Sequence, residues 1–206
     1  MKKMARVKNT AILLLLCCVL TACGWRSPAP DYYVLAPEAT VAPLAAGGPS
    51  VLLRKLALPA YLDRENLVLR QGQDLHLVLA ERKLWAEGLN RALPRLLEES
   101  MRPVLQQQGL DMAWEDGASQ PALLVDVTVL RFDGSPGHEV ELVARWRVLD
   151  QDESLLIQGG FGKKAGGGND YAEMVQALRQ LGVELGQELA GAALTAQAGR
   201  ARLPGK

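Results

Sequence analysis

Two long stretches in the second half of the chain alternate apolar and polar residues, and this constrains the fold more than any other feature. In 122–132, leucine and valine occupy every second position. In 139–150, apolar residues again take every second position, with glutamate and arginine between them. Successive side chains of a strand point to opposite faces, so one face of each stretch is buried and the other solvated. The stretches therefore predict two antiparallel strands joined by the turn at 134–137.

Two further stretches have helical periodicity. In 83–108 and 171–195, apolar residues recur every three or four positions and form one stripe. Pro94 lies within the first stretch, where a mid-helix proline costs roughly 3 kcal/mol, so a kink or break is expected there. Asp170 precedes the second stretch, and Glu173 follows three residues later, a capping-box arrangement that predicts where this helix begins.

The remaining strand candidates complete the fold class. Apolar segments at 51–58, 66–70 and 75–80 precede the first helix, and 155–161 precedes the second. The order is strands, helix, strands, helix, with short meander-like connections. We expect an α+β two-layer sandwich, with a mostly antiparallel sheet and the two long helices packed on one face.

The N-terminus has the layout of an export signal. Residues 1–10 carry four basic side chains and no acid, and 11–20 are all apolar. A run of ten is too short to cross a bilayer as a helix, which takes about 20 residues. The run ends in Leu-Thr-Ala-Cys, which resembles the lipobox of bacterial lipoproteins. It predicts a signal peptide over 1–22, cleaved between Ala22 and Cys23. An ordinary secretory signal with an incidental cysteine is the alternative.

Lipidation of Cys23 has chemical consequences for the mature chain. Cys17 and Cys18 leave with the signal peptide and Cys23 becomes a thioether, so neither a disulfide nor a thiol-based metal or catalytic site is expected. No cofactor is expected besides the covalent lipid. Removing the signal leaves 19 of the 23 basic residues and all 23 acidic ones, a formal charge of −4. Nucleic acid is not an expected partner, because its ligands usually present a basic face.

Composition divides the mature chain into a tether and one domain. Residues 23–50 are rich in Pro, Ala and Gly and contain one short edge-strand candidate at 32–35. The folded domain is expected over 51–196, and 197–206 reads as a loose tail. Hydrophobic residues make up 49% of the sequence, which is enough for a real core.

No pattern in the chain indicates catalysis or metal binding. Gly159–Gly168 is glycine-rich but has the wrong spacing for a phosphate-binding loop, and Lys164 stands where that loop needs Ser or Thr. We expect this segment to be a flexible loop before the last helix. His76 and His138 are isolated from each other and from acids at helical spacing. The chain is therefore not expected to be an enzyme, and no catalytic or metal residue is assigned.

Five short motifs, in order along the chain, resemble those of the ABC-type transport auxiliary lipoproteins. They cover most of the chain between residues 20 and 195. The motifs are Tyr32–Leu35, Leu58–Leu62, Leu84–Leu89, Val127–Gly134 and Tyr171–Leu178.

The resemblance implies a function that composition cannot supply. Members of this family accompany MCE-domain proteins, which move lipids between the inner and outer membranes and support envelope integrity. The resemblance implies a lipoprotein held on the periplasmic face of the outer membrane that docks the MCE assembly. Gly24 after the lipidated cysteine is compatible with outer-membrane sorting.

Two functional classes follow, an adaptor and a carrier. An adaptor joins the transport machine to the membrane and needs a filled core, whereas a lipid carrier needs its own apolar cavity between sheet and helices. Tyr32 and Tyr33 are candidate partner contacts, because a strand beside the tether can pair with another sheet edge, including that of a second copy in a homo-oligomer. Trp85 is expected to belong to the core.

Overall fold

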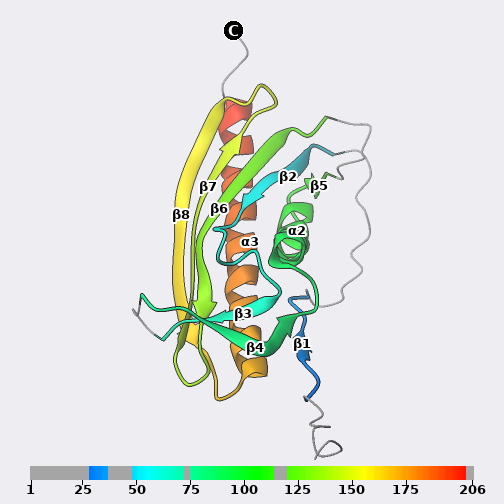
Figure 1. The fold of residues 1–206 in the computed structure, drawn as a ribbon. Helices are drawn as coiled ribbons and strands as arrows, with labels where there is room; N and C mark the ends of the chain where they lie inside the picture. Colours follow the sequence, from blue (N-terminus) through cyan, green and yellow to red (C-terminus); the bar gives the residue numbers. More distant parts are fainter. Residues whose placement is uncertain (1–27, 37–47, 72–74, 114–119, 203–206) are drawn as a thin grey trace, which may run out of the picture. The chain divides into compact units, whose positions relative to one another are not determined.

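The three long strands in the second half of the chain form an antiparallel ladder, as their alternation predicts. In the computed structural model, β6 (Leu123–Gly134) pairs with β7 (Glu139–Leu149), and β7 pairs with β8 (Leu155–Gly166) (Figure 1). In the turn between β6 and β7, Gly137 has a φ of 77°, which glycine adopts without the steric cost of a Cβ. The structure describes residues 28–36, 48–71, 75–113 and 120–202.

The sheet as a whole is mixed, and the expectation of a mostly antiparallel sheet is wrong. The other described strands are β1 (Asp31–Tyr33), β2 (Ser50–Ala57), β3 (Asn66–Leu69), β4 (Val78–Trp85) and β5 (Asp111–Met112). Of the seven strand pairs among the described residues, four are parallel: β1–β4, β2–β5, β2–β6 and β3–β6. β2 and β6 run parallel because the chain between them crosses through a helix rather than a tight turn.

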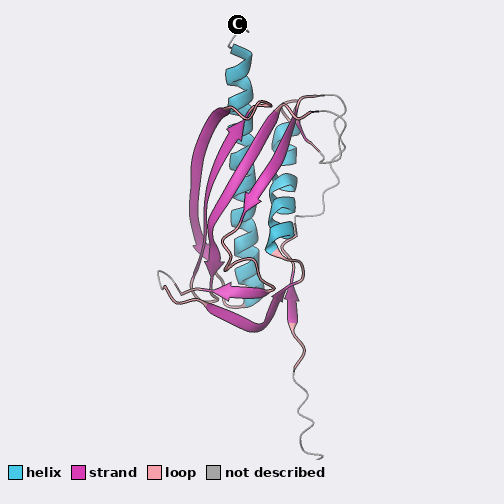
Figure 2. Ribbon diagram, turned by 45° about the horizontal axis from the view of Figure 1, so that its top comes forward, coloured by secondary structure: helices cyan, strands magenta, loops and turns pink. Residues whose placement is uncertain are grey.

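Both helices lie on the same side of the sheet, which gives the expected two layers (Figure 2). The first, α2 (Leu89–Gln106), packs against β2, β5 and the second helix, α3 (Tyr171–Arg202), which also packs against β6, β7 and β8. The predicted cap of α3 is present, with the Glu173 backbone N–H donating to the Asp170 carboxylate at 2.9 Å. The Glu173 carboxylate accepts in return from the backbone N–H of Asn169, at 2.6 Å, and not from that of Asp170 as the capping box predicts.

The start of the first helix was predicted too early. Lys83 to Trp85 belong to β4, and the helix begins at Leu89. The three residues are strand because they pair with β1, a contact between distant segments that local periodicity cannot anticipate. Trp85 is buried, with 6% of its surface exposed, so its core role is confirmed although it lies on a strand. The helix continues through Pro94 without the expected break.

Two segments expected to be irregular are regular. The glycine-rich segment expected to be a loop belongs to β8 as far as Gly166, because it pairs along its length with β7, so the strand expected over 155–161 continues to Gly166. Gly159 lies opposite Trp146, whose indole occupies the space that a Cβ would need. The C-terminal tail expected over 197–206 is helical as far as Arg202, since α3 continues to that residue.

The core fills the space between the two layers. The side chains of Leu93 and Leu97 on α2 and Val125 on β6 have no exposed surface, and they belong to one continuous apolar cluster. Neither of the helices in the described ranges, α2 or α3, combines the length and hydropathy that crossing a membrane requires.

Candidate functional site

The short strand inside the predicted tether lies at an edge of the sheet, as expected. β1 pairs in parallel with the end of β4, and no other described strand pairs with it. The Lys83 ammonium donates to the Asp31 carboxylate, and this hydrogen bond raises the pKa of Lys83. Lys83 also lies 5.2 Å from the centre of the Tyr171 ring on α3. The segment that leads into the domain is thus held by backbone pairing, an ion pair and an aromatic contact.

The two tyrosines of β1 have different environments. Tyr33 packs on the core, with its ring centre 6.2 Å from that of Tyr171, and Leu35 beyond it is buried. Tyr32 and Val34 alternate with them and are 63% and 55% exposed. Of the two candidate partner contacts, Tyr32 is exposed, whereas Tyr33 is partly buried against the core.

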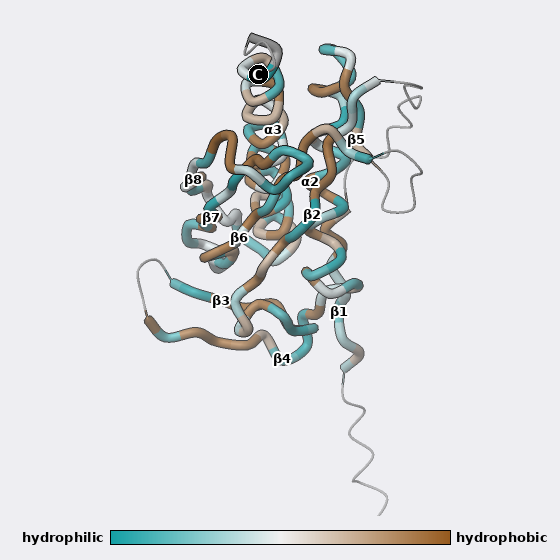
Figure 3. The backbone as a smooth tube through the Cα atoms, turned by 90° about the horizontal axis from the view of Figure 1, so that it is seen from above, coloured by the Kyte–Doolittle hydropathy of each residue, from teal (hydrophilic) through white to brown (hydrophobic). Residues whose placement is uncertain are grey.

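A second group of exposed apolar side chains lies at and just before the start of β4, in the segment 75–80 that was predicted as a strand but not as an exposed patch. Leu75 is 93% exposed, Val78 48% and Leu79 41%. Figure 3 shows this stretch as one of the hydrophobic segments of the tube. Because Val78 and Leu79 are adjacent and both exposed, neither face of the strand is covered here. The run of consecutive apolar residues at 77–80 could have indicated this patch, because a strand with one solvated face has apolar residues only at alternate positions.

The opposite face of β6, away from the helices, carries a buried aspartate bound by two arginines. The Asp126 carboxylate accepts from Arg54 on β2, at 2.7 and 2.9 Å, and from Arg147 on β7, at 2.8 and 3.0 Å. These hydrogen bonds, those of Arg54 above all, lower the pKa of Asp126, so the carboxylate stays ionised. Arg54 reaches a second acid, Glu153, at 2.9 Å. The cluster ties three strands together on the solvated face.

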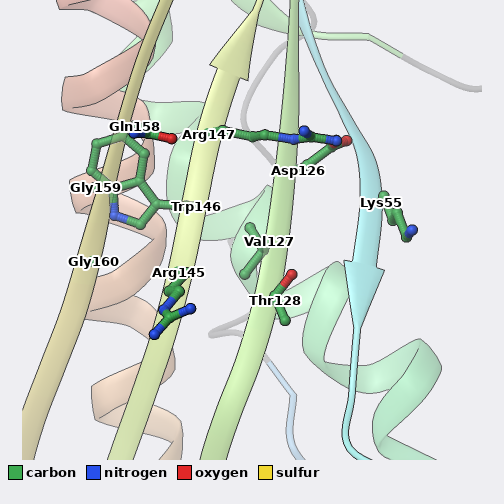
Figure 4. A pocket seen from close by; sticks show the side chains of 10 residues that line it. All are labelled: Lys55, Asp126, Val127, Thr128, Arg145, Trp146, Arg147, Gln158, Gly159 and Gly160. Atoms are coloured by element: carbon green, nitrogen blue, oxygen red, sulfur yellow. The ribbon is translucent and has the colours of Figure 1, made fainter. Parts of the chain in front are cut away.

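Beside this cluster the sheet is hollowed. The hollow has a volume of about 620 Å³ and opens to solvent on the face without helices (Figure 4). Strand register places its residues in two neighbouring rows: Gln158, Arg147 and Asp126 cross β8, β7 and β6, and Gly160, Arg145 and Thr128 follow beneath. Gly160 has no side chain, so the second row leaves space over β8. The remaining lining residues are Lys55, Val127, Trp146 and Gly159.

A second aspartate of β6 organises the far end of the strand. Asp133 has no exposed surface and accepts from Arg70 at 2.9 Å, from Arg131 at 2.8 Å and from the Tyr61 hydroxyl at 3.0 Å. Burial, with the nearby Asp133 charge second, raises the pKa of Tyr61 to about 12. The two arginines compensate the charge of Asp133 and the Tyr61 hydroxyl adds a hydrogen bond, so the cluster holds a buried carboxylate in place.

The lipidation and cleavage residues, Cys23 and Ala22, lie outside the described residues. Among the residues that the structure describes, no group of three or more His, Cys, Asp or Glu side chains is placed to hold a metal ion. The geometry therefore offers surfaces for binding, namely exposed Tyr32 and Val34, the start of β4 and the hollow over β8.

Comparison with known proteins connects the chain to a transport family. The model of the ABC-type transport auxiliary lipoprotein component family matches residues 33–190, which is more than half of the chain. No curated protein matches the sequence.

Two solved structures share the fold. A crystal structure of an uncharacterised protein is 24% identical, covers 81% of this chain and 99% of its own, and superimposes with a TM-score of 0.66. A protein from Xanthomonas campestris of the family DUF330 is 16% identical, with 85% and 99% of the two chains covered and a TM-score of 0.60. At these identities the similarity establishes the fold alone.

Proposed function

Because the chain belongs to the family of ABC-type transport auxiliary lipoprotein components, we propose that it is a non-enzymatic adaptor of a transport system that moves lipids between membranes. Acyl chains on Cys23 would hold it on the periplasmic face of the outer membrane. Its partner would be an MCE-domain protein. Several acyl chains give durable anchoring, since each buried methylene contributes about 0.8 kcal/mol.

The filled interior is the observation that favours an adaptor over a lipid carrier. A carrier needs an apolar void between its layers, whereas Leu93, Leu97 and Val125 meet there without exposed surface. The hollow over β8 lies on the other face of the sheet and is lined largely by polar side chains. The core therefore supports a protein that binds through its surface.

The exposed side chains of β1 are the proposed docking surface. Tyr32 lies on this edge strand and Val34 directly after it, both within the predicted tether, and the free side of β1 has no partner among the described strands. An open edge can accept a strand from another protein, with side chains such as Tyr32 providing specificity. A second copy could use the same edge, so this proposal includes a homo-oligomer as one assembled form.

Co-purification tests the proposed function. The tagged full-length lipoprotein is isolated from membranes in mild detergent, and the expected result is recovery of an MCE-domain protein. Tyr32→Asp should reduce that recovery, because it places a charge on the proposed surface. Leu155→Asp is the matched control, since Leu155 is 52% exposed on β8, a different edge strand. Absence of any MCE-domain protein from the wild-type sample would contradict the proposal.

A further inference from the structure

Arg145 is an exposed arginine whose neighbours carry no compensating charge. It lies on β7, where its cross-strand neighbours are Thr128 on β6 and Gly160 on β8. No ion pair or hydrogen bond joins its side chain to any of the residues that the structure describes. Thr128 offers a hydroxyl and Gly160 has no side chain, so the Arg145 guanidinium faces the hollow of about 620 Å³ over β8 (Figure 4).

The acid nearest to this hollow is already neutralised. The Asp126 carboxylate is bound by Arg54 and Arg147, which leaves it little capacity for another cation. Around the hollow stand Lys55, Arg145 and Arg147 against Asp126 alone, a net lining charge of +2. Lys55, like Arg145, has no ion pair within the described ranges. A positive hollow on a mature chain of negative formal charge is a local arrangement, not a consequence of composition.

We propose that this hollow binds a phosphate group, carried by a phospholipid headgroup or by a soluble phosphate ester. The Arg145 guanidinium, the Thr128 hydroxyl, the Gln158 amide and the free edge of Arg147 offer donors from three adjacent strands. A phosphate group can accept two hydrogen bonds from one guanidinium and further hydrogen bonds from other directions. A planar carboxylate uses both of its oxygens in one such pair with a guanidinium. The missing side chain at Gly160 provides the space beside Arg145.

The site binds and does not react. Its lining contains no cysteine or histidine, and it lies on the sheet face away from β1's contact with α3. This inference goes beyond the adaptor role and is independent of it, because phosphate binding can be measured on the purified lipoprotein without any protein partner. A failure of either proposal leaves the other standing.

Isothermal titration of the mature lipoprotein in neutral detergent, at low ionic strength, tests the inference. The probes are inorganic phosphate, glycerol phosphate, the short-chain phospholipid dihexanoyl phosphatidylglycerol and, as a carboxylate, glutarate. We expect the phosphate probes to bind and Arg145→Gln to weaken binding about tenfold, since it removes a charge-assisted fork. The matched control is Arg91→Gln, an exposed arginine on α2. Circular dichroism confirms that both variants are folded.

The probes distinguish the sources of the phosphate. Tighter binding of phosphatidylglycerol than of glycerol phosphate assigns the site to a lipid headgroup, and equal binding assigns it to a soluble ester. Either result supports the inference. It is overturned when glutarate binds as well as phosphate, when no phosphate probe binds, or when Arg145→Gln and Arg91→Gln bind alike.

Discussion

At the scale of single residues, two aspartates of β6 organise the face of the sheet that the helices leave open. Asp126 holds arginines from β2 and β7, and Asp133 holds Arg70 and Arg131. A buried carboxylate is tolerated only when its charge is paired and its oxygens are hydrogen-bonded. Each aspartate therefore fixes the positions of arginines on neighbouring segments.

Asp133 is the more sensitive of the two because it has no exposed surface. Asp133→Asn removes the charge and leaves two mostly buried guanidinium groups without it. We expect the free energy of unfolding, measured by urea denaturation, to fall by about 3–5 kcal/mol. Asp152→Asn, at an exposed acid, should change it by less than about 0.5 kcal/mol. Equal effects of the two variants would show that the cluster does not stabilise the fold.

Tyr61, which donates to Asp133, makes the stability of the fold depend on pH above about pH 10. Its pKa is raised from 10.0 to about 12, so between these values the folded chain keeps a proton that the unfolded chain releases. Its contribution to stability is complete below pH 10 and is lost as pH rises towards 12. The stability advantage of the wild type over Tyr61→Phe should therefore be constant up to about pH 10 and shrink above it. An advantage that is constant to pH 12 would contradict the raised pKa.

The Asp126 cluster and the hollow beside it are features of the sheet surface that the sequence could not predict. The alternation in β6 predicted one buried and one solvated face, and Asp126 lies opposite the buried valines, but the arginines bound to it bury it as well. Its partner Arg54 is 72 residues away, on a strand that pairs in parallel, so no local pattern connects the two. The hollow beside Arg145 depends in the same way on Gly160, whose position opposite Arg145 no local pattern indicates.

At the scale of elements, glycines on α3 allow the two helices to approach closely. A Cβ on Gly186 would lie 2.6 Å from the Ser100 Cβ and 3.0 Å from the Leu97 carbonyl oxygen of α2. A Cβ on Gly182 would come too close only to the end of the Leu96 side chain, at 2.6 Å, and would lie in ordinary contact with Leu93 at 3.7 Å. A side chain at position 186 would thus clash with the Ser100 Cβ and the α2 backbone, which cannot move easily. At position 182 it would clash with the flexible end of Leu96, which can change rotamer.

Gly186→Ala should therefore lower stability despite the higher helix propensity of alanine. Overpacking of this kind lowers the free energy of unfolding by about 1–3 kcal/mol. The higher helix propensity of alanine raises it by about 1 kcal/mol. Gly191→Ala is the control, since nothing lies within 4 Å of its Cβ position, and it should raise stability by up to about 1 kcal/mol. Thermal unfolding followed by circular dichroism compares them. A more stable Gly186→Ala protein would mean that the helices are not in this contact.

Local periodicity predicted which segments are helices and strands better than it predicted which strands pair. The strands β6 and β7 and both helices follow from repeats of two or of three to four residues. The parallel pairs do not, because β2–β6 and β1–β4 join segments separated by a whole helix or by two strands. The pairing of Lys83 to Trp85 with β1 also explains why a stretch with a helical stripe is partly strand.

At the scale of the whole molecule, the predicted lipid on Cys23 decides where the domain works. Cys23→Ser removes the acylated thiol, so we expect the protein to move from the membrane pellet to the soluble fraction. Pellets washed with high salt and with carbonate, followed by immunoblotting, measure this. Surface charge does not survive both washes, so a Cys23→Ser protein that stays in the washed pellet would contradict lipid anchoring.

The adaptor proposal is tested most directly by cross-linking from β1 in living cells. A photoreactive amino acid replaces Tyr32, whose side chain is 63% exposed, and in a matched strain it replaces Leu155 on β8. After illumination, cross-linked species are purified under denaturing conditions and identified by mass spectrometry. We predict that position 32 cross-links to an MCE-domain protein and position 155 does not. Cross-links from neither position to such a protein, in cells that express it, would contradict the adaptor role.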